Sequence, residues 1–204
     1  MILKDLQLGA IGTNCYILGD EGSGLCAVID PGDNAPKVLA AVRDLELQVK
    51  YILLTHGHYD HYMAVPGLRQ AFPDVPVYIH AADVSQGGRQ QYLKLPVTEG
   101  LVNWQDGDTL ELGSLTIEVL YTPGHSKGSV TLKVEDALFT GDTLFCGSMG
   151  RTDFEGGSYA EIMASLRRLA KLPGDYRVYP GHEGFTTLER ERKTNYYMQE
   201  AMGG

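Results

Sequence analysis

The sequence predicts an α/β fold in which two β-sheets pack face to face and helices cover their outer faces. Short strand-like segments occur in two runs, one in each half of the chain, and each run is followed by a segment with helical spacing. The chain has 204 residues, 43% of them hydrophobic. That is enough for one sizeable core or for two small cores packed together. We therefore predict a single domain over residues 1–204.

The first run combines short strands with one amphipathic helix. Three segments are apolar or alternate in polarity, and each is followed by glycine or by Asp-Pro-Gly; they are residues 2–8, 15–18 and 25–29. A helix is predicted over 35–47, because Val38, Val42, Leu45 and Val49 lie near helical spacing after a capping segment with a first-turn proline. Two further short apolar runs, 51–54 and 77–79, then predict strands.

The second half repeats this order. Residues 115–121 alternate in polarity, and strands are also predicted over 130–134, 137–139 and 177–179, with a helix over 159–172. Between the two halves, residues 85–108 are polar and rich in turn residues, with little periodicity. We predict a long loop there, either a lid or a substrate loop.

Charge and composition favour a small-molecule substrate. The formal net charge is -9 and the sequence pI is about 5.1, whereas nucleic acids and anionic membranes favour a basic surface. No segment approaches the roughly 20 apolar residues of a membrane helix, and polar residues interrupt the N-terminal segment where a secretory signal would be apolar. We expect a cytoplasmic protein with no nucleic-acid or membrane partner; the oligomeric state stays open. Three cysteines without a short-spaced pair are predicted to be buried apolar residues; they are Cys15, Cys26 and Cys146.

The strongest chemical signal is the segment His-Gly-His-Tyr-Asp-His at 56–61, which places four possible metal ligands within six residues. At the end of a strand, His56 and His58 share a face, and the glycine between them lets the backbone bend. Asp60 and His61 are adjacent, so the chain must turn there. If it enters a helix, His56 with Asp60 and His58 with His61 have one-turn spacing and can converge.

Three further candidate ligands each follow a glycine and an apolar strand-like run: His125, Asp142 and His182. All four clusters should therefore lie at strand ends, where sheet proteins commonly carry their sites. Seven side chains exceed the three or four that one zinc ion accepts from a protein. We assign His56, His58 and His125 to one ion and Asp60, His61 and His182 to a second, with Asp142 bridging. Imidazole and carboxylate ligands without thiolate favour zinc, with iron or manganese possible. His80 is predicted to be a structural histidine at a strand end.

The H-x-H-x-D-H cluster followed by single His, Asp and His residues resembles the metallo-β-lactamase superfamily, over essentially the whole chain. Five segments are similar to its glyoxalase II-like branch: Thr-Asn-Cys-Tyr at 13–16, Val-Ile-Asp-Pro-Gly at 28–32, Gly-Asp-Thr-Leu-Phe at 141–145, Gly-Arg-Thr-Asp-Phe at 150–154 and Pro-Gly-His-Glu at 180–183. The resemblance implies an αββα sandwich with the metals at one edge. The chain departs from the pattern in two places. Tyr-Met-Ala-Val at 62–65 replaces small residues, and only 22 residues follow His182 where full-length glyoxalase II has a helical C-terminal domain.

The predicted activity is hydrolysis by a dinuclear centre, of a hydroxyacylglutathione-like thioester or a related small ester. Two divalent cations lower the pKa of a shared water and polarise the carbonyl, and a thiol leaves as thiolate without a strong general acid. Asp60 and Asp142 are the predicted catalytic carboxylates, Asp60 also orienting water. Arg151 either binds a substrate carboxylate or is a solvated surface residue. Asp30 either orients a ligand histidine or serves only its Asp-Pro-Gly turn.

Other functions remain as alternatives. A mononuclear iron dioxygenase acting on glutathione persulfide also resembles this branch in residues 150–154, and it would use two histidines and one aspartate. The presence of Asp60, His61 and His182 argues against it. A non-catalytic metal module would not need open coordination positions. β-Lactam hydrolysis is disfavoured by Asp60 and by the lack of a signal sequence, and nuclease activity by the acidic composition.

Overall fold

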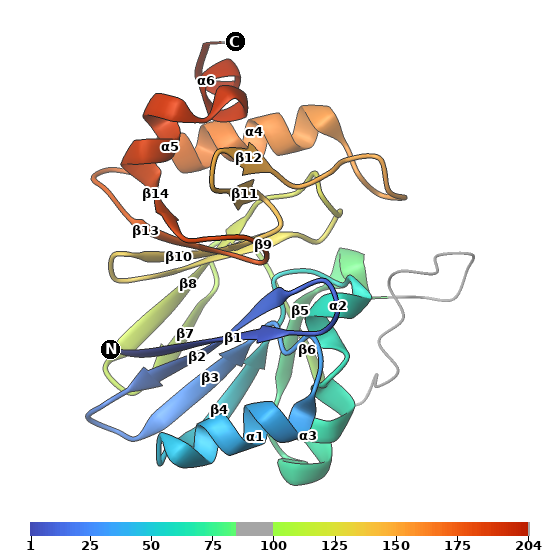
Figure 1. Ribbon diagram of the computed structural model, residues 1–204, viewed down its shortest axis with the longest axis vertical. Coiled ribbons are helices and arrows are strands. Elements are labelled where there is room, and N and C mark those ends of the chain that lie inside the picture. The colour runs from blue at the N-terminus through green and yellow to red at the C-terminus, as the bar shows by residue number, and fades with distance from the viewer. Residues whose placement is uncertain (85–99, 204) are drawn as a thin grey trace.

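Two six-stranded β-sheets face each other, and helices cover their outer faces (Figure 1). The computed structural model describes residues 1–84 and 100–203. The first sheet has the order β1 (Ile2–Leu8), β2 (Thr13–Asp20), β3 (Leu25–Ile29), β4 (Gln48–Leu53), β5 (Val77–His80) and β6 (Leu101–Trp104). The second has the order β14 (Thr186–Thr187), β13 (Arg177–Pro180), β10 (Ala137–Gly141), β9 (Val130–Val134), β8 (Leu115–Tyr121) and β7 (Thr109–Leu112). The predicted α/β sandwich is confirmed.

The helices form the two outer layers (Figure 1). On the first sheet these are α1 (Ala35–Asp44) and α3 (Val65–Ala71), and on the second α4 (Tyr159–Ala170), α5 (Leu188–Thr194) and α6 (Tyr196–Gly203). Two short turns lie near the sheet edge, α2 (Tyr59–Tyr62) and the 3-10 turn η1 (Ala81–Asp83), and a small hairpin joins β11 (Leu144–Phe145) to β12 (Ser148–Met149).

Burial follows these layers. One apolar cluster lies between the sheets and includes Tyr16, Ile29 and Phe139, all at most 1% exposed. A second cluster includes residues of α1, α3 and the first sheet, and a third includes residues of α4, α5, α6 and the second sheet. Each sheet therefore buries both faces, one against the other sheet and one against helices.

Two segment predictions were wrong. The helix predicted over 35–47 ends at Asp44, because Val49, which fitted the helical spacing, is buried as part of β4 and pairs with Cys26. The loop predicted over 85–108 includes strand β6, which pairs in parallel with β5 and buries Trp104. Its Val102 and Asn103 are both exposed, so the segment lacks the alternation that would have indicated a strand. Residues 85–99, the rest of that prediction, lie outside the described residues.

Strand direction places the ends of several strands at one edge of the sandwich. Strands β3, β4 and β5 are parallel, and so are β10 and β13. Two backbone hydrogen bonds join the sheets near these ends: Asn14 N donates to Gly181 O over 2.7 Å, and Val130 N donates to Thr55 O over 2.9 Å. Loops that leave both sheets are thus fixed against each other.

Candidate metal centre

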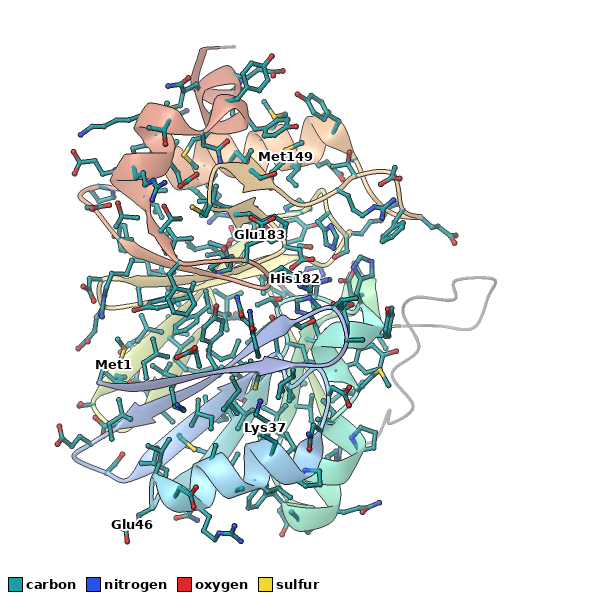
Figure 2. All side chains as sticks on the ribbon, in the orientation of Figure 1. Met1, Lys37, Glu46, Met149, His182 and Glu183 are labelled. Atoms are coloured by element: carbon teal, nitrogen blue, oxygen red, sulfur yellow. The ribbon has the colours of Figure 1, made fainter. Side chains whose placement is uncertain are left out.

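All seven predicted ligands meet at this edge. They form three overlapping groups, within each of which one donor atom per residue lies within 4.8 Å of the others. The groups are His56, His58 and His125; His56, His61 and Asp142; and Asp60, His61 and His182. The first and third are the two triads predicted from the sequence. Figure 2 places His182 where the second sheet meets the first.

Asp142 faces both triads. Its Oδ1 lies 3.4 Å from His61 Nε2, and its Oδ2 lies 3.4 Å from His125 Nε2 and 3.6 Å from His182 Nε2. One carboxylate thus reaches histidines of both groups, which is the geometry required of a bridging ligand. The residue directly follows β10, whose parallel pairing with β13 brings it beside the loop that carries His182.

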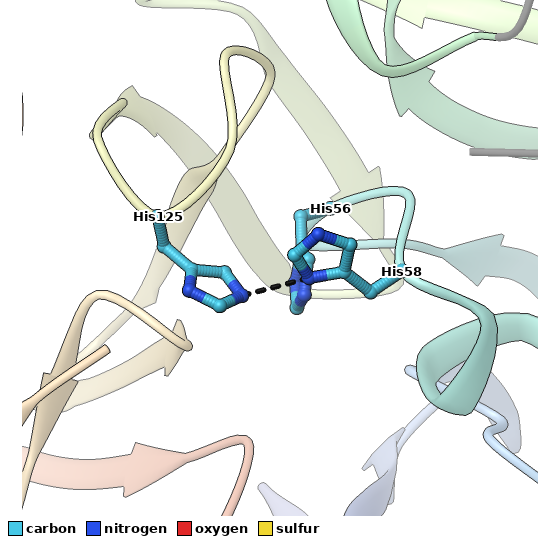
Figure 3. Close-up of side chains that lie close together, drawn as sticks. All are labelled: His56, His58 and His125. Atoms are coloured by element: carbon cyan, nitrogen blue, oxygen red, sulfur yellow. Dashed lines mark hydrogen bonds between the residues drawn. The ribbon is translucent and has the colours of Figure 1, made fainter. Parts of the chain in front are cut away.

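The all-histidine triad is tightly packed (Figure 3). His58 Nδ1 and His125 Nε2 lie 2.8 Å apart, and the His56 ring is fully buried beside them. His125 Nδ1 lies 2.8 Å from the backbone oxygen of Arg151, so Nδ1 donates there and Nε2 keeps its lone pair. That tautomer leaves the atom nearest to His58 available as a ligand.

The donor atoms fit a divalent cation. In the described part of the chain, His56 Nε2, His61 Nε2 and Asp142 Oδ1 are buried and have no hydrogen-bond partner. Unpartnered buried polar atoms are rare and costly, and these three belong to a single candidate group. Imidazole nitrogen with carboxylate oxygen is a ligand set suited to zinc, iron or manganese. The residues at this site therefore fit a divalent cation of this kind.

Electrostatics differ between the two triads. Burial, together with neighbouring histidines, lowers the pKa of His56 well below its usual value and that of His58 to about 4. These rings are neutral at pH 7, as metal ligands must be. In the other triad burial opposes charge, but the carboxylates of Asp142, Asp30 and Asp60 outweigh it and raise the pKa of His61. This half favours a positive charge, which either a proton or a cation can supply.

The chain direction changes within the 56–61 segment. His58 has extended backbone angles, φ -72° and ψ 145°, and α2 begins at Tyr59. The helical spacing considered for His56 with Asp60 therefore does not apply, because His56 lies before the helix. Asp60 and His61 instead reach the second triad from the first turn of α2.

Glycine has a steric reason before each of His125, Asp142 and His182. A Cβ on Gly124, whose φ is 130°, would lie 2.1 Å from Ile162 N. A Cβ on Gly181 would lie 2.3 Å from Asp142 Oδ1 and 2.7 Å from His61 Cε1. Gly141 has φ 48°, and a Cβ there would lie 2.4 Å from Thr55 Oγ1. The pattern seen in the sequence thus permits close approach of the ligand loops.

Side chains behind the ligands hold them in place. Asp30 Oδ2 lies 3.0 Å from His61 Nδ1, and Asp30 also accepts hydrogen bonds from the backbone and hydroxyl of Thr55. Of the two interpretations of Asp30, orientation of a histidine is therefore realised, in addition to its place in a turn. Thr13 Oγ1 donates to Asp60 Oδ2 over 3.0 Å, and Asn14 Nδ2 donates to the backbone oxygens of Pro180 and Glu183. These two roles were missed, although both residues belong to the Thr-Asn-Cys-Tyr motif.

A cleft of about 510 Å3 opens over the centre. Its floor includes predicted ligands of both triads, and its walls are largely apolar: Ile11, Tyr59, Phe145, Met149 and Phe154. Arg151 also lines the cleft, with its guanidinium 3.9 Å from the Phe154 ring centroid and paired with Asp153 at 2.7 Å. The arginine and aspartate side chains are 56% and 67% exposed. A role of Arg151 in substrate binding stays a prediction.

Other singled-out residues lie outside these groups. His80 ends β5, accepts a hydrogen bond from Ala82 N and stacks on Tyr121, as expected of a structural histidine. Cys15 and Cys26 are buried as predicted, whereas Cys146 is only partly buried, because it occupies the β11–β12 turn. No helix within residues 1–84 and 100–203 has both the length and the apolar character needed to cross a membrane.

The family model described as "Metallo-beta-lactamase superfamily" matches residues 8–182. The chain belongs to this superfamily, most of whose members are metal-dependent hydrolases.

Known relatives and solved structures cover nearly the whole chain. "Hydroxyacylglutathione hydrolase GloC" of Haemophilus influenzae is 32% identical, over 97% of this chain and 98% of its own. The crystal structure of the BLEG-1 B3 metallo-beta-lactamase is 32% identical with a TM-score of 0.84, over 97% of this chain and 99% of its own. TTHA1623 in a di-iron-bound form is 34% identical with a TM-score of 0.83, over 95% and 99%.

Proposed function

We propose that the chain is a dinuclear metal-dependent hydrolase of thioesters, similar to hydroxyacylglutathione hydrolases. The observation that carries the proposal is the convergence of seven imidazole and carboxylate side chains, three with unpartnered buried donor atoms, in and beneath one cleft. His56, His58 and His125 would hold one ion and Asp60, His61 and His182 the other, with Asp142 shared. Zinc is the favoured metal, with iron or manganese as alternatives.

Divalent cations supply Lewis acidity, which polarises a carbonyl and makes hydroxide accessible near neutral pH. Asp60 would orient the attacking water. Burial opposes its ionisation, but the neighbouring imidazoles of His182 and His61 outweigh burial and hold the pKa of Asp60 well below the usual value. Such a weak base does not take a proton from water near neutral pH, but it does accept a hydrogen bond from one. Thr13 fixes one of its oxygens, so Asp60 is preset to direct an attacking water.

A thioester suits the cleft for two reasons. The first is that a thiol with a pKa near 8.5 leaves as thiolate, so the cleft need not supply a strong general acid. The volume of about 510 Å3 and the apolar walls suit a small organic substrate. The name of the Haemophilus influenzae relative supports an acylated glutathione. Arg151 is the group we assign to a substrate carboxylate.

The test is turnover together with metal content. Wild-type protein loaded with zinc, iron or manganese should bind two ions per chain and hydrolyse S-lactoylglutathione, with release of thiol. His182→Ala should lose one ion and most activity, whereas the matched variant His80→Ala should retain both ions and its activity. A chromogenic β-lactam and a simple ester complete the panel. Two ions without thioester turnover, or β-lactam turnover alone, would reject the substrate assignment.

The second candidate is a mononuclear iron persulfide dioxygenase. One observation favours it: His56, His61 and Asp142 form a group of two histidines and one carboxylate, the ligand set of many non-haem iron oxygenases. This candidate expects one iron per chain and oxygen uptake with glutathione persulfide. It leaves Asp60 and His182 without a metal, which is why we prefer the dinuclear assignment.

A further inference from the structure

Asp83 is a fully buried carboxylate that the proposed reaction does not use. It ends the η1 turn after β5, and its side chain is 0% exposed. All three donors recorded for its oxygens belong to loops that carry predicted metal ligands: Gly57 N, Gly128 N and Ser126 Oγ. Because a buried carboxylate needs these hydrogen bonds, Asp83 and its three donors hold one another in place.

The two oxygens divide these contacts. Asp83 Oδ2 accepts from Gly57 N at 2.9 Å and from Ser126 Oγ at 2.6 Å, and Oδ1 accepts from Gly128 N at 2.6 Å. Gly57 separates His56 from His58, and Ser126 directly follows His125. One carboxylate therefore joins the two loops that supply the all-histidine triad.

The other triad has its own buried aspartate. Asp30 contacts His61 Nδ1 and Thr55, and Asp83 has no recorded contact with Asp60, His61 or His182 in the described chain. We propose that Asp83 is a positioning residue for one ion only, holding the His56–His58 loop and the His125 loop at the spacing that the all-histidine site requires. The inference rests on the metal centre proposed above.

Asp83→Asn tests this with little change in shape. An amide has one acceptor oxygen, so whichever way it is turned, its NH2 group faces at least one donor that the carboxylate accepted. Either the Gly57 and Ser126 side or the Gly128 side loses its acceptor. We expect the affinity of one of the two ions to fall about 10- to 100-fold, the range typical when a group that orients metal ligands is changed, while the other affinity is unchanged.

The measurement is metal affinity by competition with a chelator, followed by stoichiometry, neither of which requires a substrate. Asp20→Asn is the matched control, because Asp20 is also buried and accepts from Ser114 Oγ and Ser23 N, and these contacts within residues 1–84 and 100–203 involve no ligand loop. That variant should bind both ions as wild type does. In a His125→Ala background, which already lacks the first site, adding Asp83→Asn should leave the remaining ion's affinity unchanged.

Two results would overturn the inference: Asp83→Asn binding both ions like wild type, or losing affinity for both equally. If Asp83→Asn does not fold, Ser126→Ala removes a single donor to the same carboxylate and should weaken the same ion by a smaller factor. Equal effects on both ions, or none, in that variant would also overturn the inference. A wild-type protein that binds fewer than two ions would instead refute the proposed dinuclear centre.

Discussion

Replacing Gly181 by alanine should break the metal centre through a single methyl group. The added Cβ would lie 2.3 Å from Asp142 Oδ1, about 1.1 Å short of the 3.4 Å at which ordinary contact begins, and 2.7 Å from His61 Cε1. Metal–ligand distances tolerate only about 0.2 Å, so a shift of this size removes Asp142 or His61 from coordination. Misplacement of reacting groups by about 1 Å costs roughly 100-fold in rate.

Gly181→Ala should therefore lose at least one of two ions and about 100-fold or more in kcat/KM for S-lactoylglutathione. Overpacking should also cost about 1–3 kcal/mol of unfolding free energy. Gly184→Ala is the control, because it lies three residues further on and its Cβ meets nothing within 4 Å. Metal analysis and thermal unfolding of both variants make the comparison. A Gly181→Ala protein with two tightly held ions and normal turnover would refute this reasoning.

Two further predictions concern the cleft wall. Glu191 is fully buried and accepts hydrogen bonds from Gly147 N and Thr186 Oγ1. Glu191→Gln should therefore loosen the β11–β12 hairpin and raise KM severalfold, with metal content unchanged. The control is Glu189→Gln at an exposed position, and loss of an ion in Glu191→Gln would contradict this role. Arg151→Ala should weaken binding of carboxylate-bearing thioesters about tenfold but leave binding of uncharged thioesters unchanged. The free energy of unfolding should not change, because the exposed Arg151–Asp153 ion pair contributes little to it. Equal losses for both substrate types in steady-state kinetics would exclude a carboxylate-binding role.

The strand-end arrangement of the candidate ligands was predictable because the 56–61 segment follows an apolar run, and His125, Asp142 and His182 each follow an apolar run and a glycine. That local pattern indicates where a strand stops, and parallel pairing then brings the stops to one edge. The number of candidate ligands indicated two ions, and Asp142, which was assigned to the bridging position, lies 3.4 Å from both His61 Nε2 and His125 Nε2. Steric reasons for Gly141 and Gly181 were not predictable, because the atoms that a Cβ would meet belong to Thr55, Asp142 and His61, which are distant in the sequence.

Except for the contact of Asp30 with His61, the contacts behind the ligands escaped sequence reasoning because they too depend on residues distant in the sequence. Asp83 lies three residues past His80, at the end of the short Ala-Ala-Asp turn, and nothing local distinguishes it from a helix cap. Its donors are 26 to 45 residues away. Thr13 and Asn14 act on residues 47 and 166 positions distant. Strand β6 was missed because its burial depends on pairing with β5, while its own polarity pattern resembles a loop.

Contacts at the metal centre also join the two sheets of the sandwich. Backbone hydrogen bonds from Asn14 to Gly181 and from Val130 to Thr55 cross between the sheets next to the ligand loops. His61 then links Asp30, which follows a strand of the first sheet, to Asp142, which follows a strand of the second. Each proposed ion would be held by residues that follow strands of both sheets, and would add a further connection across the same junction. Since a ligand that binds only the folded state stabilises it, metal occupancy should stabilise the junction between the two sheets most of all.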